Sequence, residues 1–107
     1  MKLVIITSSL AFLKDIKAIL KKADIKTYSF REVTGFMDFS DTATPENWFA
    51  SEVNETESLL FYAFVKKENV DKVFQLVTEF NSTQESLSQI HIAVLNIEKS
   101  NNLKNDQ

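Results

Sequence analysis

The segment LLFYAFV, residues Leu59 to Val65, is the most hydrophobic run of the chain. It shows no alternation of polar and apolar residues, and this pattern is typical of a strand that is covered on both faces. Leu3-Val-Ile-Ile6 is a shorter run of the same character. Both runs are therefore predicted to be central strands of a sheet.

Two amphipathic segments follow these runs. From Leu10 to Ala23 apolar residues recur at spacings of three and four, with lysines on the opposite side, which predicts a surface helix capped by Ser8 or Ser9. A second helix is expected to open near Asn69. Its predicted apolar face consists of Val70, Val73, Val77 and Phe80.

Two further segments complete the predicted sheet. Ile25 to Phe36 is rich in β-forming residues but more polar, as expected for an edge strand, and Ile90 to Leu95 is a fourth strand. The order β-α-β-β-α-β predicts a ferredoxin-like α+β domain, an antiparallel four-stranded sheet with two helices on one face. It spans residues 1–98, and residues 99–107 form a polar tail.

The predicted packing leaves one face of the sheet uncovered. Both helices are expected on the same face, yet the central runs are apolar on both faces. Another copy of the chain is the simplest cover for the open face, so a homotrimer is predicted.

The connection over residues 37–58 is far longer than a hairpin needs. Between Asp38 and Glu57 it contains six acids and no Lys or Arg, together with three large aromatics. We interpret it as a mobile partner-binding loop, and the alternative is that its aromatics dock on the protein's own body. The residues predicted to meet a partner are Asp38, Phe39, Asp41, Trp48 and Phe49.

Composition restricts the function classes. The chain of 107 residues has a formal net charge of −3 and no cysteine, which disfavours nucleic acid as a partner and excludes disulfides. His91 has no partner in sequence and is predicted to be a half-buried structural residue rather than a metal ligand. No catalytic motif is found, so we predict a protein that is not an enzyme, has no metal site and does not insert into a membrane.

Gly35 is the only glycine of the chain. Glycine is favoured where φ is positive or where the backbone must approach another group closely. Its position after an apolar run predicts a turn or another special backbone site at the base of the long connection.

Three stretches resemble the nitrogen-regulatory PII family. They are the opening Met1-Lys-Leu-Val4, the motif Glu32-Val-Thr-Gly-Phe36 before the long connection, and Glu68-Asn-Val-Asp-Lys72. The resemblance implies a ferredoxin-like trimer with a cleft between subunits, at which an adenine nucleotide meets the glycine of the motif. It places Ser29, Gly35, Phe36 and Met37 at that cleft.

The chain departs from the family in its phosphate-binding loop. The equivalent stretch, Ser82 to Gln89, contains neither glycine nor lysine, and Met37 stands where the family has a glycine. A triphosphate needs cations or a nest of backbone amides, so binding of ATP in the usual family manner is not expected.

The function implied by the resemblance is that of a cytoplasmic, non-enzymatic regulator. Such a protein senses a small-molecule effector, an adenine nucleotide being the first candidate, and contacts a target such as a transporter or an enzyme through its long loop. It needs no cofactor. The alternative is a CutA-like trimer that binds divalent cations, with the carboxylates of the loop as ligands.

Overall fold

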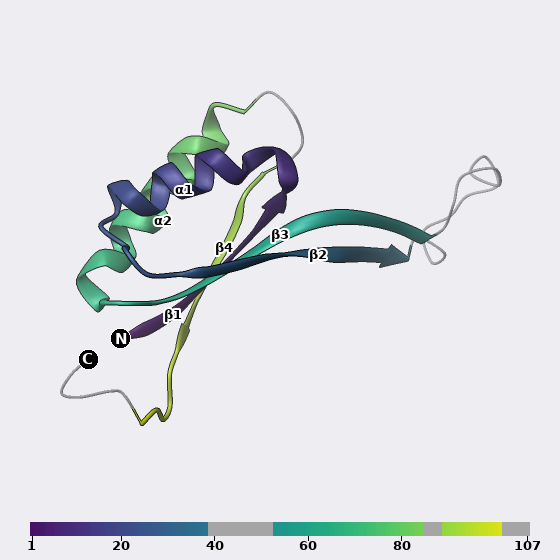
Figure 1. Ribbon diagram of the computed structural model, residues 1–107. Coiled ribbons are helices and arrows are strands. Elements are labelled where there is room, and N and C mark those ends of the chain that lie inside the picture. The colour runs from purple at the N-terminus through teal and green to yellow at the C-terminus, as the bar shows by residue number, and fades with distance from the viewer. Residues whose placement is uncertain (39–52, 85–88, 102–107) are drawn as a thin grey trace.

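The computed structural model describes residues 1–38, 53–84 and 89–101. Along the chain lie β1 (Lys2–Ser9), a 3-10 turn η1 (Leu10–Phe12), α1 (Leu13–Lys22), β2 (Ser29–Asp38), β3 (Val53–Val65), α2 (Lys67–Ser82) and β4 (His91–Asn96). In this described part, the strands form one antiparallel sheet in the order β2-β3-β1-β4, and both helices cover the same face (Figure 1). The predicted ferredoxin-like α+β fold is confirmed.

The two hydrophobic runs form the middle of the sheet, as predicted. In β1 and β3 alternate side chains are buried beneath the helices, among them Val4 and Ile6 of β1 and Phe61 of β3. The core is completed by apolar residues of both helices, including Ile16, Leu20, Val73 and Val77. The periodicity of the helices therefore identified the correct core face.

The start of the first helix differs from the prediction. Residues 10–12 form a 3-10 turn, and the α-helix begins only at Leu13. Neither serine caps it through its side chain, because the Ser8 hydroxyl donates to the Ser9 carbonyl at 2.9 Å and Ser9 makes no side-chain cap hydrogen bond. Ser8, which the sequence predicted as a possible helix cap, is instead a buried residue of β1.

One residue at the end of α1 has a left-handed backbone conformation. Asp24 has a φ of 63°, the one positive φ among the described residues. Its N–H donates to the Lys21 carbonyl at 3.0 Å, and the Ile25 N–H donates to the Leu20 carbonyl at 2.9 Å. These two bonds form a Schellman motif, in which glycine is the usual left-handed residue.

A side-chain clamp joins the end of α2 to the start of β4. The Asn81 amide nitrogen donates to the Ile90 carbonyl at 2.8 Å, and the Ile90 N–H donates to the Asn81 amide oxygen at 2.8 Å. Nearby, the rings of Phe12 and Phe80 meet edge to face with centroids 5.1 Å apart. The two Asn81 hydrogen bonds satisfy the backbone N–H and C=O of Ile90, whose side chain is buried.

The strands around the long connection extend further than predicted. Pairing of β2 with β3 runs without interruption from Ser29↔Tyr62 to Asp38↔Val53, so both ends of the expected loop over residues 37–58 belong to strands. β1 pairs with β3 only as far as Ser9↔Ser58. Residues 34–38 and 53–57 therefore form a two-stranded ribbon, here called the protruding ribbon, that extends beyond the helices (Figure 1).

Among the described residues, no helix is both long enough and apolar enough to cross a membrane.

Candidate functional site

The face of the sheet opposite the helices, here called the open face, carries a row of large apolar side chains. Because side chains alternate along a strand, the neighbours of the buried residues point to this face. Tyr62, Phe64 and Leu95 remain 43%, 57% and 43% exposed. Leu3 and Ile5 of β1 lie between them, since Leu3 pairs with both Phe64 and Leu95, and Ile5 pairs with Tyr62.

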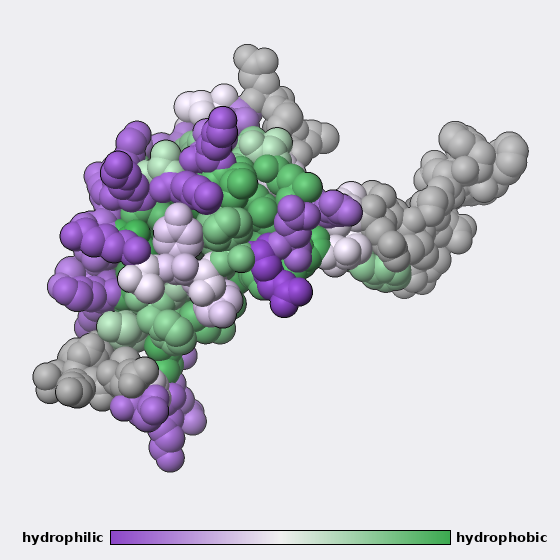
Figure 2. Space-filling model, in the orientation of Figure 1, coloured by the Kyte–Doolittle hydropathy of each residue, from purple (hydrophilic) through white to green (hydrophobic). Residues whose placement is uncertain are grey.

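An uncovered apolar face of this kind favours contact with another surface. Full burial of a large apolar side chain contributes about 1.5–3 kcal/mol, and for these residues roughly half of that gain is still available. In the view of Figure 2, hydrophilic side chains gather over the helices and in a patch over β2 and β3, and hydrophobic ones reach the surface between these two regions. The open face is therefore the strongest candidate for an interface in the described structure.

The predicted ligand residues do not form one site within a single chain. Ser29 and Gly35 lie on the open face, at opposite ends of β2, six positions apart. At the rise of a strand this separation is roughly 20 Å. Phe36 points to the other face and is 62% exposed, and the side chain of Met37 lies outside the described residues. Within one chain, Ser29 and Gly35 are therefore too far apart to contact the same small chemical group.

Gly35 is not at a turn, so the first of the two alternatives predicted for it was wrong. It lies inside β2, opposite Thr56, and its φ is not positive. A Cβ at this position would lie 3.4 Å from the Thr56 Oγ1 and 3.5 Å from the Ser58 Oγ, which are ordinary van der Waals contacts. What the glycine supplies is a bare stretch of backbone on the open face of the ribbon.

The predicted partner-binding residues fall mostly outside the described part of the chain. Asp38 is the last residue of β2, and its side chain is not described. Phe39, Asp41, Trp48 and Phe49 all lie in the undescribed segment 39–52. Their role stays a prediction.

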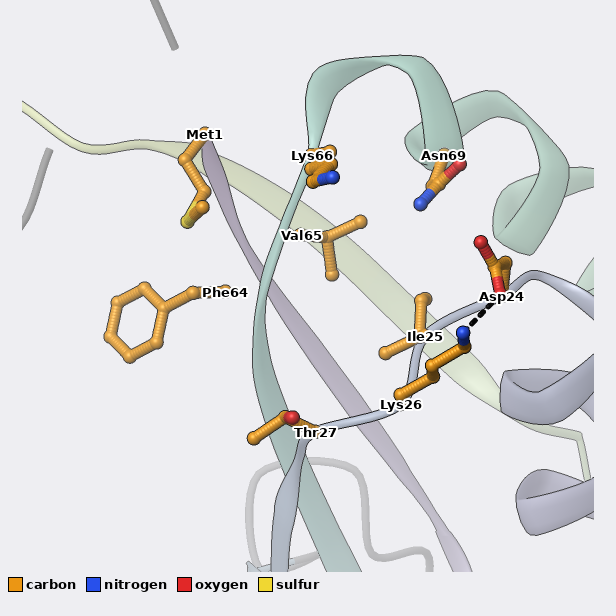
Figure 3. Close-up of a pocket in the computed structure, with 9 residues that line it drawn as sticks. All are labelled: Met1, Asp24, Ile25, Lys26, Thr27, Phe64, Val65, Lys66 and Asn69. Carbon is orange, nitrogen blue, oxygen red and sulfur yellow. Dashed lines mark ion pairs between the residues drawn. The ribbon is translucent and has the colours of Figure 1, made fainter. Parts of the chain in front are cut away.

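A cavity that the sequence did not indicate lies at the end of the sheet where β3 leads into α2. It has a volume of about 260 Å³, and three separate segments line it: Met1, Asp24, Ile25, Lys26, Thr27, Phe64, Val65, Lys66 and Asn69 (Figure 3). Met1 and Phe64 lie on one side, and Asn69 and the ion pair of Asp24 with Lys26 lie on the other (Figure 3).

This cavity adjoins the open face. Phe64 belongs to both, and Thr27 lies two positions before Ser29. Its floor is apolar, formed by Ile25 and Val65, while the charged and amide groups stand at its rim. The end of the sheet that carries Ser29 is therefore hollowed, with lysines beside it.

His91 differs from the prediction of a half-buried residue. It is exposed on the open face at the start of β4, where it pairs with Thr7 of β1. Within the described residues, no three His, Cys, Asp or Glu side chains gather closely enough to hold a metal ion. The carboxylates proposed as cation ligands belong largely to the undescribed connection.

Comparison with known proteins finds solved structures with a similar fold. Neither a scan against models of protein families nor a search of curated proteins finds a match. The structure of GlnK from B. subtilis is similar, with a TM-score of 0.63 and 21% identity over 88% of this chain and 83% of that one. A complex of that GlnK with ATP matches at a TM-score of 0.63 and 20% identity, over 88% of this chain and 80% of that one. GlnK is a PII protein, so the fold implied by the resemblance is confirmed.

Proposed function

We propose that this chain is a divergent PII-like regulator, a homotrimer that binds an effector between its subunits and contacts a target protein without catalysing a reaction. The observation that carries the proposal is the open face, with its large apolar side chains left uncovered. The fold shared with GlnK supports it, and one of the GlnK structures is a complex with ATP.

Assembly through the open face accounts for the exposed side chains of the central strands. Phe64 is more than half exposed in the single chain, although it sits in the most hydrophobic strand of the sequence. Three sheets packed around a common axis bury Tyr62, Phe64 and Leu95, while the helices stay outside. An interface of this type is apolar in its centre, as obligate interfaces are.

The effector cleft follows from the same assembly. One subunit supplies the Ser29 end of β2, with the cavity beside it, and its neighbour supplies the Gly35 end. The bare backbone at Gly35 lets a ligand approach closely. We propose an adenine nucleotide as the effector, with the contacts made mainly to its base and ribose, because Ser82 to Gln89 lacks the glycines and lysine of a phosphate-binding loop.

The first experiment is sedimentation of the wild-type chain and two variants. We expect the wild type to sediment at three times the chain mass of 12.3 kDa. Phe64→Asp places a charge on the open face and should give monomers. Phe74→Asp is the matched control, because Phe74 is 44% exposed but lies on α2, outside the open face. A wild-type monomer at micromolar concentration contradicts the proposal.

The second experiment is calorimetry with ATP, ADP and AMP. We expect one site per chain in the wild type, affinities that vary little with the number of phosphates, and loss of binding in the monomeric Phe64→Asp variant. Titration with Cu²⁺, Zn²⁺ and Mg²⁺ tests the CutA-like alternative, in which the carboxylates of the long connection bind cations. Cation binding without nucleotide binding would favour that alternative.

A further inference from the structure

The protruding ribbon has two free edges in the described structure. On one side β2 is the outermost strand of the sheet, so every second residue directs its backbone N–H and C=O groups away from β3. On the other side β1 ends at Ser9, opposite Ser58, and residues 53–57 of β3 have no further strand beside them among the described residues. A ribbon of two strands alone is only marginally stable in water.

The ribbon also lacks three of the features by which edge strands avoid new partners, namely proline, lysine and a bulge. Its pairing is regular from Ser29↔Tyr62 to Asp38↔Val53, with no bulge, and neither strand contains proline or lysine. Exposed edges are commonly protected by lysine, proline or a bulge. The free edge of β2 is therefore open to the addition of a further strand.

One side chain of the ribbon is conspicuously exposed. Phe36 is 62% exposed, the highest fraction among the large hydrophobic residues that the structure describes as exposed. It lies on the helix side of β2, since Phe30, on the same side, stacks on the buried Phe61 with ring centroids 4.9 Å apart. Packing of sheets through the open face leaves Phe36 uncovered, because its side chain points the other way.

On the helix side of β2 and β3, where Phe36 lies, the described charged side chains are acidic, whereas Arg31 lies on the open face. Glu32 lies on the same side of β2, and Glu57 lies opposite Thr34 on β3; both are exposed. From Glu32 to Val65 the sequence contains no lysine or arginine. A shallow hollow of about 470 Å³ runs along this part of β2, lined by Arg31, Glu32, Val33, Thr34 and Glu57.

We infer that the protruding ribbon is a docking element for a basic, extended segment of a partner protein, which joins the free edge of β2 as an additional strand. The backbone groups of β2 supply hydrogen bonds, Glu32 and Glu57 pair with lysines or arginines of the segment, and Phe36 packs on its apolar side chains. The inference deepens the proposed function and rests on it in one respect, that the chain is a regulator with a protein target.

The test uses the full chain and a synthetic peptide of the repeat Lys-Thr-Val-Thr, called the lysine–valine peptide, which places lysine and valine on the same face of a strand. The repeat Lys-Pro-Val-Pro, called the lysine–proline peptide, has the same charge but cannot pair as a strand, and the repeat Glu-Thr-Val-Thr can pair but has the wrong charge. We expect the lysine–valine peptide to bind at least tenfold more tightly than either control, measured by fluorescence anisotropy. Hydrogen exchange should slow at the outward-facing amides of β2 between Val33 and Asp38.

Two substitutions locate the site. Glu57→Lys is expected to weaken binding of the lysine–valine peptide at least tenfold, and Phe36→Ala several-fold. Glu98→Lys is the matched control, because Glu98 is exposed but lies beyond β4, and it should change the affinity less than twofold.

Several outcomes would overturn the inference. These are absent binding of the lysine–valine peptide, equal binding of the lysine–proline peptide, protection that appears elsewhere, or ribbon amides already protected in the protein alone by pairing with a second copy. Sedimentation and nucleotide titration of the Glu57→Lys variant keep the two proposals apart. If these stay normal while peptide binding is absent in the wild type, only the ribbon inference fails.

Discussion

Replacing Gly35 with alanine separates two roles that a lone glycine can have. A glycine with positive φ, or one packed against backbone, is costly to replace. Gly35 has no positive φ, and a new Cβ would meet the Thr56 Oγ1 at 3.4 Å, the Ser58 Oγ at 3.5 Å and the Thr56 carbonyl oxygen at 3.6 Å, none of them closer than ordinary contact. Both neighbours are small side chains at ordinary contact distance, so the fold accepts the methyl group.

The magnitude follows from the unfolded state. Alanine restricts the unfolded chain more than glycine does, and at a permissive φ this contributes about 0.4–1 kcal/mol of stability. We therefore expect Gly35→Ala to leave the free energy of unfolding unchanged or to raise it by about that amount. In a domain of this size the melting temperature would rise by roughly 2–6 °C.

Effector binding is expected to respond in the opposite direction. In the proposed cleft the methyl group occupies the space where the ligand approaches bare backbone, so the affinity for a nucleotide should fall at least tenfold. Urea unfolding at a fixed protein concentration and calorimetry measure the two effects separately. Thr34→Ala, next to Gly35 but pointing to the helix side, is the control and should leave nucleotide affinity unchanged.

A drop in melting temperature of several degrees in Gly35→Ala would refute the structural reasoning, because it would mean that the methyl group is not accommodated. Raised stability together with unchanged nucleotide affinity would remove Gly35 from the cleft while leaving the description of β2 intact.

Three further changes test other parts of the fold. Asp24→Gly should raise the free energy of unfolding by about 0.5–1 kcal/mol, because glycine adopts the left-handed φ of 63° without steric cost. Urea unfolding measures this change, and Asp24→Ala, the control, should be less stable than Asp24→Gly. Asn81→Ala should lower the free energy of unfolding by about 2–3 kcal/mol, because the buried N–H and C=O of Ile90 lose both partners. A loss below 0.5 kcal/mol by urea unfolding would count against the clamp. Replacing residues 39–52 with Asn-Gly should leave the melting temperature and the oligomer mass unchanged, since Asp38 and Val53 are already paired and a two-residue turn closes such a hairpin; loss of the trimer would instead assign the connection a packing role.

The sequence predicted the parts of the fold that depend on hydrophobic pattern. Leu59 to Val65 and Leu3 to Ile6 could be placed in the middle of the sheet because only central strands are apolar on both faces, and the apolar spacing of α2 identified Val73 and Val77 as core. These features repeat along the chain and do not depend on distant contacts.

The errors concern single residues whose conformation depends on distant neighbours. A turn was one of the two alternatives predicted for Gly35, because glycine permits one, but the long pairing of β2 with β3 keeps this residue extended. The left-handed position is occupied by Asp24, which the α1 hydrogen bonds hold in place and which no local pattern marks. The cavity near Lys26 and Lys66 could not be predicted either, since it forms only where three separate segments meet.

The position of β1 between β3 and β4 has a consequence for the order of folding. β2 and β3 are consecutive along the chain, so their pairing closes a single connection. The pair Lys2↔Asn96, by contrast, joins residues from opposite ends of the domain, and its loop-closure entropy costs about 1.7 kcal/mol more. We therefore expect the β2–β3 pairing to be established early and the β1–β4 pairing late, with Asn81 and Ile90 orienting β4 as it arrives. Until β4 pairs, β1 has a free edge on the side where β4 will lie. In this interval the folding chain is most exposed to aggregation.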